Sequence, residues 1–425
     1  MTMARALGRR AYRAALRGLF ALLSPAGKLG RLVTPPYDPH AVRRILVVRL
    51  GLLGDGTALL APALRLAKLH FPQAEVHVLA TPLQAPVLAP LPSVTRVIPW
   101  TAGDLTEPRQ ALRPQAWRDA ARTIRDLRAQ RFDLALACYG ALASAIAFAS
   151  GARYRFGYAG EALPGTLTHA LPGGRYDRPW HEVHYSAALV AAAAGQPVAG
   201  GAPTLPWSRP ASALPGAGTS ADGPPDVPPA ELHVTPAARQ AMDRLLGNAG
   251  GSSRLAVFLP GATNGAAKRW PVAHWAALAR FAAADGWQVV LAGGTAERVL
   301  SAEIAVRAGL PVLDVTGRTS VEELLALLER AGAVVAGDSG PMHLATALGR
   351  PVVAIHGPTA PWISGPFDRR RAVVVRRDLP CSPCYRLDRV ADCPLGHTLC
   401  QWLVRPDEVY RAMQQVAQRA VAERP

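Results

Sequence analysis

Both halves of this sequence repeat the same order of strand, glycine-rich turn and helix. In the first half, the apolar run 45–50 precedes the turn 51–56 and a helix expected over 57–70. In the second half, strand 255–259 is followed by helix 271–285, strand 287–292 and helix 296–308. Strands that alternate with helices are typical of βαβ units and a parallel sheet. The sequence therefore predicts an α/β protein with two doubly wound domains.

A stretch rich in Pro, Gly, Ala and Ser separates the two halves. The chain has 425 residues, the length expected of two domains rather than one. We predict a basic N-terminal segment (1–43), a Rossmann-like domain (44–195), a Pro/Gly-rich linker leading into the next domain (196–253), a second Rossmann-like domain (254–404) and a C-terminal helix (405–425). The last helix is expected to pack back across the domains.

The charge balance indicates an anionic partner. Lys and Arg number 47 against 30 Asp and Glu, so the formal net charge is +17. A nucleic acid, an anionic membrane surface and a phosphorylated substrate would all suit this charge. The basic residues are scattered and no nucleic-acid-binding motif is present, which disfavours the first of these.

Two segments bear on membrane contact. Tyr12, Leu16, Leu19, Phe20 and Leu23 share one face of a basic helix, which could lie in a bilayer interface or pack on the protein's own surface. Residues 134–152 carry no charge, but Gly140 and Gly151 interrupt them. We predict a buried strand and a small-residue helix there, not a transmembrane span.

Four strand-ending turns carry the candidate site residues, because parallel sheets bind ligands beyond the carboxyl ends of their strands. Asp55, between Gly54 and Gly56, is a candidate general base or a helix N-cap. Thr263 and Asn264, with Lys268 four residues after Asn264, form either a phosphate cradle or a capped loop with a surface lysine.

The other two turns lie later in the second half. Glu297 follows Gly293-Gly294 and could accept hydrogen bonds from ribose hydroxyls or complement a helix dipole. Asp338, Ser339, Gly340 and His343 lie in a glycine-containing turn that opens a helix, a place suited to a diphosphate. His343 alone could equally be a core histidine.

Taken together, these motifs resemble a known family. Segments 47–55, 260–271, 293–297 and 337–354 are similar to glycosyltransferase family 9, the lipopolysaccharide heptosyltransferases, and the resemblance runs from Arg44 to Tyr410. It implies a GT-B fold, in which two Rossmann-like doubly wound domains face a cleft, with the acceptor on the first and the nucleotide-sugar on the second. It further implies inverting, metal-independent transfer of a heptose or a related sugar, from ADP-heptose or another nucleotide-sugar, to a lipopolysaccharide-type or other anionic glycan acceptor.

The resemblance also assigns roles to residues. Asp55 becomes the base that deprotonates the acceptor hydroxyl. The donor-binding residues are Thr263, Asn264 and Lys268 for the diphosphate, Glu297 for the ribose, and Asp338, Ser339, Gly340 and His343 for the sugar and phosphates. Gly56 and Gly51 depart from the residues usual in the family, so we expect a looser acceptor loop. A sugar-nucleotide epimerase and a non-catalytic nucleotide-sugar-binding homologue are the alternatives.

The cysteines raise a separate question. Cys381 and Cys384 have a metal-ligand spacing, and Cys393 and Cys400 follow, with His397 between them. A structural zinc, a reduced thiol cluster and disulfides all remain open. No cofactor is expected to be required for catalysis, and the resemblance places the protein in the cytoplasm, peripheral to the inner face of the bacterial inner membrane.

Overall fold

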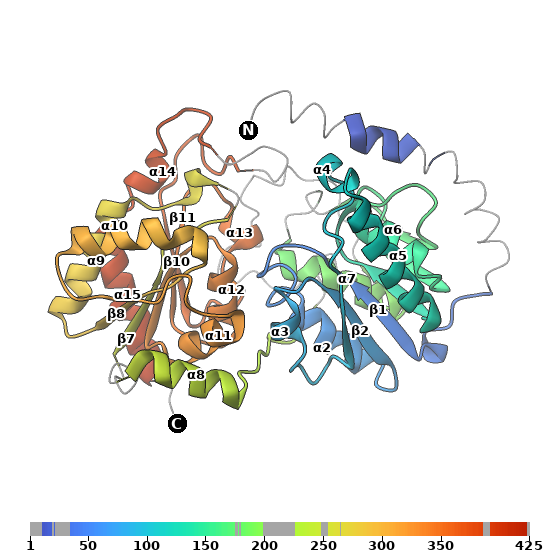
Figure 1. Ribbon diagram of the computed structural model, residues 1–425, viewed down its shortest axis with the longest axis horizontal. Coiled ribbons are helices and arrows are strands. Elements are labelled where there is room, and N and C mark those ends of the chain that lie inside the picture. Colours follow the sequence, from blue (N-terminus) through green and yellow to red (C-terminus); the bar gives the residue numbers. More distant parts are fainter. Residues whose placement is uncertain are drawn as a thin grey trace. The chain divides into compact units, whose positions relative to one another are not determined.

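The computed structural model of the chain forms two compact units, Met1–Pro228 (unit 1) and Pro229–Pro425 (unit 2). It describes residues 11–18, 21, 35–174, 177, 180–198, 226–247, 254–263, 265–385 and 392–422. Across these residues the strands make two six-stranded sheets, one in each unit, and neighbouring strands pair in parallel (Figure 1). The predicted α/β architecture is confirmed.

Unit 1 has the strand order β3-β2-β1-β4-β5-β6. Its strands are β1 (Arg44–Val48), β2 (Glu75–Ala80), β3 (Arg96–Pro99), β4 (Leu134–Ala137), β5 (Tyr154–Tyr158) and β6 (His169–Leu171). Its helices are η1 (Pro39–Ala41), α2 (Ala61–His70), α3 (Ala85–Leu88), α4 (Pro108–Ala111), α5 (Pro114–Ala129), α6 (Gly140–Ala149) and α7 (Glu182–Ala193). The chain winds outward from β1 in one direction and then from β4 in the other, so a topological switch point lies between these two strands.

Unit 2 repeats this plan with the order β12-β11-β10-β7-β8-β9. Its strands are β7 (Leu255–Leu259), β8 (Gln288–Leu291), β9 (Leu313–Asp314), β10 (Ala333–Gly337), β11 (Val352–His356) and β12 (Ala372–Arg376). Its helices are α8 (Pro236–Leu246), η4 (Ala266–Lys268), α9 (Val272–Ala284), η5 (Thr295–Glu297), α10 (Arg298–Ala308), α11 (Val321–Arg330), α12 (Gly340–Ala347), α13 (Pro361–Ser364), α14 (Leu399–Trp402) and α15 (Pro406–Ala422). Its switch point lies between β7 and β10.

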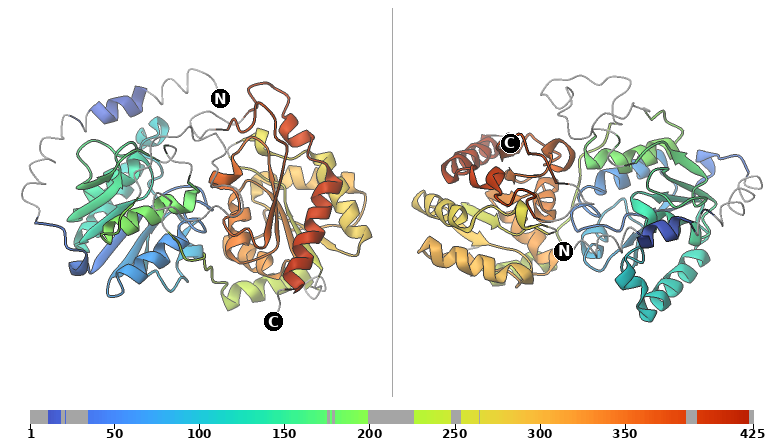
Figure 2. Two further views of the ribbon diagram at one scale, coloured as in Figure 1. Left: turned by 180° about the vertical axis from the view of Figure 1, so that it is seen from behind. Right: turned by 90° about the horizontal axis from the view of Figure 1, so that it is seen from above.

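Helices cover both faces of each sheet, which buries the central strands except for Arg44 at the start of β1 (Figure 2). In unit 1, Leu46 and Val48 of β1 share a core with α5 and α6, while α2 and α7 pack against each other. In unit 2, Phe258 and Trp275 lie in a core that includes residues of α15. Burial of this kind stabilises a sheet by roughly 25 cal/mol for each Å² of apolar surface removed from water.

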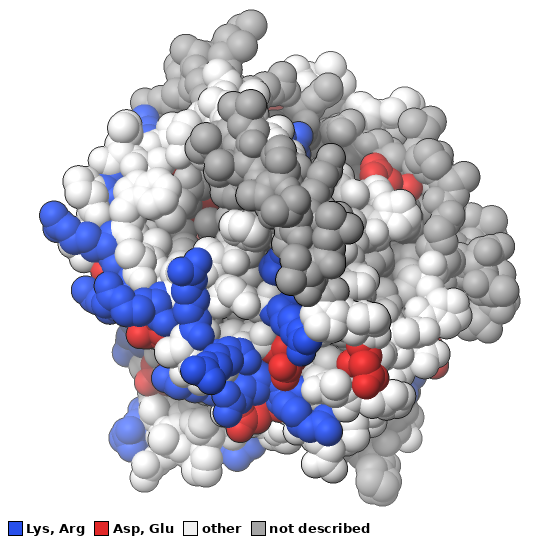
Figure 3. Space-filling view, turned by 90° about the vertical axis from the view of Figure 1, so that its right-hand side faces the viewer, with Lys and Arg blue, Asp and Glu red and all other residues white. Residues whose placement is uncertain are grey.

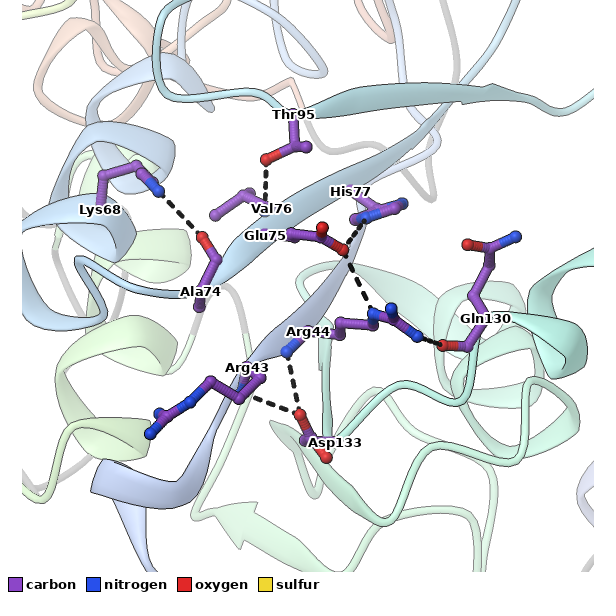
Figure 4. Close-up of polar contacts among 10 residues, drawn as sticks. All are labelled: Arg43, Arg44, Lys68, Ala74, Glu75, Val76, His77, Thr95, Gln130 and Asp133. Atoms are coloured by element: carbon purple, nitrogen blue, oxygen red, sulfur yellow. Dashed lines mark hydrogen bonds and ion pairs between the residues drawn. The ribbon is translucent and has the colours of Figure 1, made fainter.

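Polar contacts tie together the amino ends of the strands in unit 1 (Figure 4). The Asp133 carboxylate accepts hydrogen bonds from the backbone amides of Arg43 (2.8 Å) and Arg44 (2.9 Å). The Arg44 guanidinium pairs with Glu75 of β2 at 3.2 Å and donates to the Gln130 carbonyl at 2.9 Å. These contacts link β1, β2 and the segment before β4 at the amino ends of the strands, the end opposite the switch-point loops.

Several local predictions can be compared with the structure. Ser320 and Glu323 form a capping box at the start of α11. Residues 134–152 fold as β4 and α6, as predicted, and no helix in the described part of the chain is long and apolar enough to cross a membrane. Helix α8 lies inside the range 196–253 and packs on α11. Helix α15 packs on α9 and on β10–β12, and its packing across the domains stays a prediction.

Candidate functional site

Lys268 and Asp338 meet at the switch point of unit 2. Lys268 ends η4, on the loop after β7, and Asp338 directly follows β10. The Lys268 Nζ and Asp338 Oδ2 atoms are 3.3 Å apart, and the two side chains are only 9% and 10% exposed. The structure thus joins two predicted site residues that are 70 positions apart in the sequence.

The surroundings of this ion pair keep Asp338 ionised. Burial raises the pKa of the Asp338 carboxyl, but Lys268 and then His356 and His343 lower it by more, so the net pKa shift is downward. The Lys268 Nζ lies 5.0 Å from the centre of the Tyr385 ring, a cation–π distance. The Lys268 carbonyl accepts a hydrogen bond from buried Gln401 at 3.0 Å. The cation therefore has a fixed position at the strand ends.

Glu297 lies at the end of β8, the next strand along the sheet. Its side chain packs against Gly261 at the end of β7 and against Gly293 and Gly294 after β8. A Cβ atom on Gly261 would lie 2.6 Å from Glu297 Cγ, closer than real contacts allow. Glycine at this position therefore makes room for the half-buried carboxylate beside the switch point.

The remaining predicted donor-site residues occupy the same loops. Ser339 is the N-cap residue of α12 and makes no side-chain capping hydrogen bond, Gly340 begins the helix, and His343 is buried in its first turn. His343 lies near enough to Asp338 to lower the pKa of that carboxyl. Thr263 is exposed on the loop between β7 and η4. Asn264 lies outside the described residues.

His356 is a member of this cluster that the sequence analysis missed. It ends β11, next to β10, and its side chain is fully buried with Nδ1 3.0 Å from the Thr359 Oγ1 atom. Burial lowers the pKa of the His356 imidazole to about 4, partly opposed by Asp338. The sequence could have indicated His356, because it lies at the end of an apolar strand, as the candidate site residues do.

We expect the neutral His356 to make stability depend on pH. Its pKa is lower in the folded state than in the unfolded chain, so the unfolded chain gains a proton first as pH falls from about 6.5 towards 4. This difference in pKa should lower the free energy of unfolding by up to about 3 kcal/mol as the pH falls from about 6.5 to about 4. Urea denaturation at pH 7 and pH 4.5 checks it: His356→Asn, which cannot titrate, should lose less stability than the wild type. Equal losses in the two proteins would contradict the assignment.

Asp55 lies at the switch point of unit 1, in a run of turns between β1 and α2. Helix α2 begins at Ala61, and its N-cap residue is Leu60. Asp55 is therefore not the N-cap of α2, which removes one alternative for its role. The side chain is half-buried, and backbone hydrogen bonds from Gly56 to Leu52 (3.0 Å) and from Leu59 to Gly54 (3.1 Å) shape the turn around it.

The turn at Gly56, expected to be a looser loop, is packed against Gln84 in the structure, so the expectation of looseness is wrong. Buried Gln84 donates a hydrogen bond to the Gly51 carbonyl at 2.8 Å and accepts one from the Thr81 amide at 3.0 Å. A Cβ atom on Gly56 would lie 2.0 Å from Gln84 Nε2. Gln84 thus occupies the space that an aliphatic side chain at position 56 would fill, and from there it supports the turn that carries Asp55. No sequence pattern marks Gln84, because the contact is tertiary.

This packing predicts strong coupling between positions 56 and 84. Gly56→Ala should destabilise the protein by about 1–3 kcal/mol, since the added methyl group collides with Gln84. The same substitution should have a smaller effect in a Gln84→Ala background, where the colliding atoms are gone. Urea denaturation of the two single variants and the double variant measures the coupling. Additive effects would show that Gln84 does not occupy this space.

The four C-terminal cysteines are free thiols in this structure, as is Cys138. Within the described residues, which include all four, no group of three or more His, Cys, Asp or Glu side chains is arranged to hold a metal ion. Burial, followed by the proximity of Cys384, Cys393 and Cys381, raises the pKa of Cys400 to about 11. The four thiols therefore lie near one another, and structural zinc, reduced thiols and disulfides stay open as predictions.

Known proteins match this chain over most of its length. A family model described as glycosyltransferase family 9 (heptosyltransferase) matches residues 120–393. Lipopolysaccharide heptosyltransferase 2 of Salmonella typhimurium is 30% identical over 339 residues, covering 78% of this chain and 87% of that protein. Lipooligosaccharide heptosyltransferase 2 of Haemophilus influenzae is 28% identical over 314 residues, covering 72% and 81%.

A solved structure agrees with the observed fold. The ADP-heptose lipopolysaccharide heptosyltransferase II of E. coli superposes with a TM-score of 0.64 at 24% identity, covering 89% of this chain and 99% of that one. Two doubly wound units with polar side chains at each switch point define the fold class as GT-B. The chain belongs to glycosyltransferase family 9 (heptosyltransferase).

Proposed function

We propose that this protein is an inverting, metal-independent heptosyltransferase that moves a heptose from ADP-heptose to a lipopolysaccharide-type acceptor. The observation that carries the proposal is the buried Lys268–Asp338 pair at the switch point of unit 2, flanked by Glu297. Relatives named as lipopolysaccharide heptosyltransferases support the sugar and the acceptor class. The solved relative named for ADP-heptose supports the donor.

In this proposal the donor diphosphate lies against Lys268 and the start of α12. Negative charge develops on the leaving diphosphate oxygen as the bond to the anomeric carbon breaks. Lys268, held at a fixed position, and the amides at the start of α12 would stabilise that charge in place of a metal ion. Thr263 and Asn264 would contact the diphosphate, Glu297 the ribose hydroxyls, and Asp338, Ser339, Gly340 and His343 the sugar and phosphates.

Asp55 serves as the general base. The acceptor hydroxyl oxygen attacks the anomeric carbon from the face opposite the diphosphate, its proton passes to the Asp55 carboxylate, and ADP leaves. One displacement of this kind inverts the anomeric centre. The half-buried position of Asp55 on a turn braced by Gln84 supports the role, because a base must be both accessible and oriented.

We also propose that the enzyme works in the cytoplasm, at the inner face of the inner membrane. Five free thiols suit a reducing compartment, where disulfides are rare. The net charge of +17 suits anionic phospholipids and a phosphorylated, lipid-linked acceptor. The basic N-terminal segment would contribute to this contact.

A donor screen tests the proposal. ADP-heptose should raise the melting temperature of the protein more than UDP- or GDP-sugars do, because a ligand that binds only the folded state stabilises it. Transfer activity should persist in EDTA. If no nucleotide or nucleotide-sugar raised the melting temperature, the proposed donor site would be wrong, and loss of activity in EDTA would refute metal independence alone.

A further inference from the structure

Helix α5 of unit 1 presents a strongly basic outer face. Successive residues of an α-helix turn by about 100°, so most of the exposed residues of α5 fall within an arc of about 140°. That arc contains Trp117, Arg118, Ala121, Arg122, Arg125 and Arg128, all of them exposed. Asp126, which is also exposed, lies about 40° beyond Arg122, and Asp119 lies about 20° further. Four guanidinium groups thus share one face, and the two carboxylates of the helix lie at its Arg122 margin.

Two of these arginines donate hydrogen bonds within the protein, Arg128 to the Ala149 carbonyl at 2.8 Å and Arg118 to the Gln115 side chain at 3.3 Å, and all four stay exposed. Within the described part of the chain, the one ion pair that they make is a long contact of 3.7 Å between Arg122 and Asp119, with the Arg122 side chain 69% exposed. By contrast, Arg44 at the sheet edge is held by Glu75 and Gln130 (Figure 4). Figure 3 looks onto this side of unit 1 and shows basic side chains gathered over its lower left part.

Large apolar side chains accompany the charges. Leu112, in the turn between α4 and α5, is 82% exposed, and Trp117 at the start of α5 is 51% exposed. The Trp117 indole donates a hydrogen bond to the Ala111 carbonyl at 2.8 Å, which holds its ring against that turn. Trp and Leu beside arginines match the side chains that enter the boundary between lipid headgroups and acyl chains.

The basic N-terminal segment reaches the same end of α5. Tyr12 donates a hydrogen bond to the Leu105 carbonyl at 3.3 Å, and Arg13 pairs with Glu107 at 2.6 Å, just before α4. This described part, residues 11–18, therefore packs on unit 1 through Tyr12 and Arg13. Arg17, one turn further along, is also exposed.

We infer that the outer face of α5, with Leu112 and Trp117 at one end, is the surface by which this protein docks on an anionic phospholipid bilayer. The arginines would contact the headgroups, and Leu112 and Trp117 would enter the interface. A nucleic acid would use the arginines but has no need of an exposed leucine, so the bilayer is the better match. The inference rests on the proposed function only in expecting the acceptor to be lipid-linked.

Vesicle co-sedimentation at low ionic strength tests this inference without donor or acceptor, so its failure would leave the transfer assay unaffected. The full-length protein should bind phosphatidylglycerol vesicles and not phosphatidylcholine vesicles. Each arginine near a membrane strengthens binding about fivefold, so the triple variant Arg118→Gln/Arg122→Gln/Arg125→Gln should bind at least tenfold more weakly. The matched control Arg254→Gln/Arg280→Gln/Arg307→Gln removes the same charge from exposed positions of unit 2 and should bind nearly as well as the wild type.

A second pair of variants tests the apolar contact. Leu112→Glu should weaken vesicle binding, whereas Val306→Glu, at an equally exposed position on α10, should not. Circular dichroism of all variants checks the fold. The inference is overturned if the wild type does not bind anionic vesicles, or if each variant binds as its control does. Loss of duplex RNA binding without loss of vesicle binding would assign the face to nucleic acid and also overturn it.

Discussion

Lys268→Met is expected both to destabilise the protein and to abolish donor binding. Methionine matches the length of the lysine stem but leaves the buried Asp338 carboxylate without its cation. Removing one partner of a buried ion pair typically costs about 3–5 kcal/mol. Loss of the charge that is proposed to face the diphosphate should in addition reduce transfer by at least about 10²–10³-fold, to below detection in an end-point assay. Urea denaturation and a coupled ADP-release assay measure the two effects.

Two further variants separate stability from chemistry. Lys268→Met/Asp338→Leu removes both charges, so it should recover much of the lost stability and none of the activity. Arg254→Met breaks an exposed ion pair of 2.9 Å with Asp285 in the same unit and should cost no more than about 1 kcal/mol. If the double variant regained transfer activity, Lys268 would be a structural residue and the donor site would have to lie elsewhere.

Asp55→Asn is expected to lower kcat by about 10²–10⁴-fold while leaving donor affinity unchanged. Asparagine preserves the shape of the side chain but cannot accept the acceptor proton. The substitution should barely affect the melting temperature, because the carboxylate is half-buried on a turn held by Gln84 and by backbone hydrogen bonds. Steady-state kinetics and titration with the donor check the two parts.

A second aspartate of unit 1 provides a control for the loss of one negative charge. Asp126→Asn removes a negative charge from the exposed surface of α5 in the same unit and should leave kcat within about twofold of the wild type. Transfer at the wild-type rate by Asp55→Asn would mean that another group takes the proton. A loss of donor binding in that variant would instead indicate a structural role for Asp55.

The local sequence pattern predicted the fold best where an apolar run was bounded by turns. Strand β7 has the predicted bounds, Leu255–Leu259. Helix α2 begins four residues later than predicted, because the glycine-containing turns continue to Leu60. Helix α7 is buried at nearly every position, so its sequence has no alternation of polar and apolar residues by which a helix could be recognised. Strand β6 has three residues, too few to show any alternation.

The site was predictable to the extent that it follows strand ends. Lys268 and Asp338 were found because each follows a strand next to the switch point, and their direct contact follows from the strand order. Gln84 and Gln401 could not be found in this way. Each reaches a strand-end loop from a distant part of the chain, Gln84 to Gly51 and Gln401 to Lys268. Such bracing is a property of tertiary packing and leaves no local pattern.

The most direct test of the proposed function is a transfer assay with a defined donor and acceptor. Purified enzyme is incubated with ADP-heptose and a lipopolysaccharide core acceptor that lacks heptose, and the acceptor mass is followed by mass spectrometry. The account predicts one added heptose, equimolar release of ADP, an inverted anomeric centre, and no product with Lys268→Met. Binding of ADP-heptose without any transfer, or transfer that Lys268→Met leaves undiminished, would contradict it.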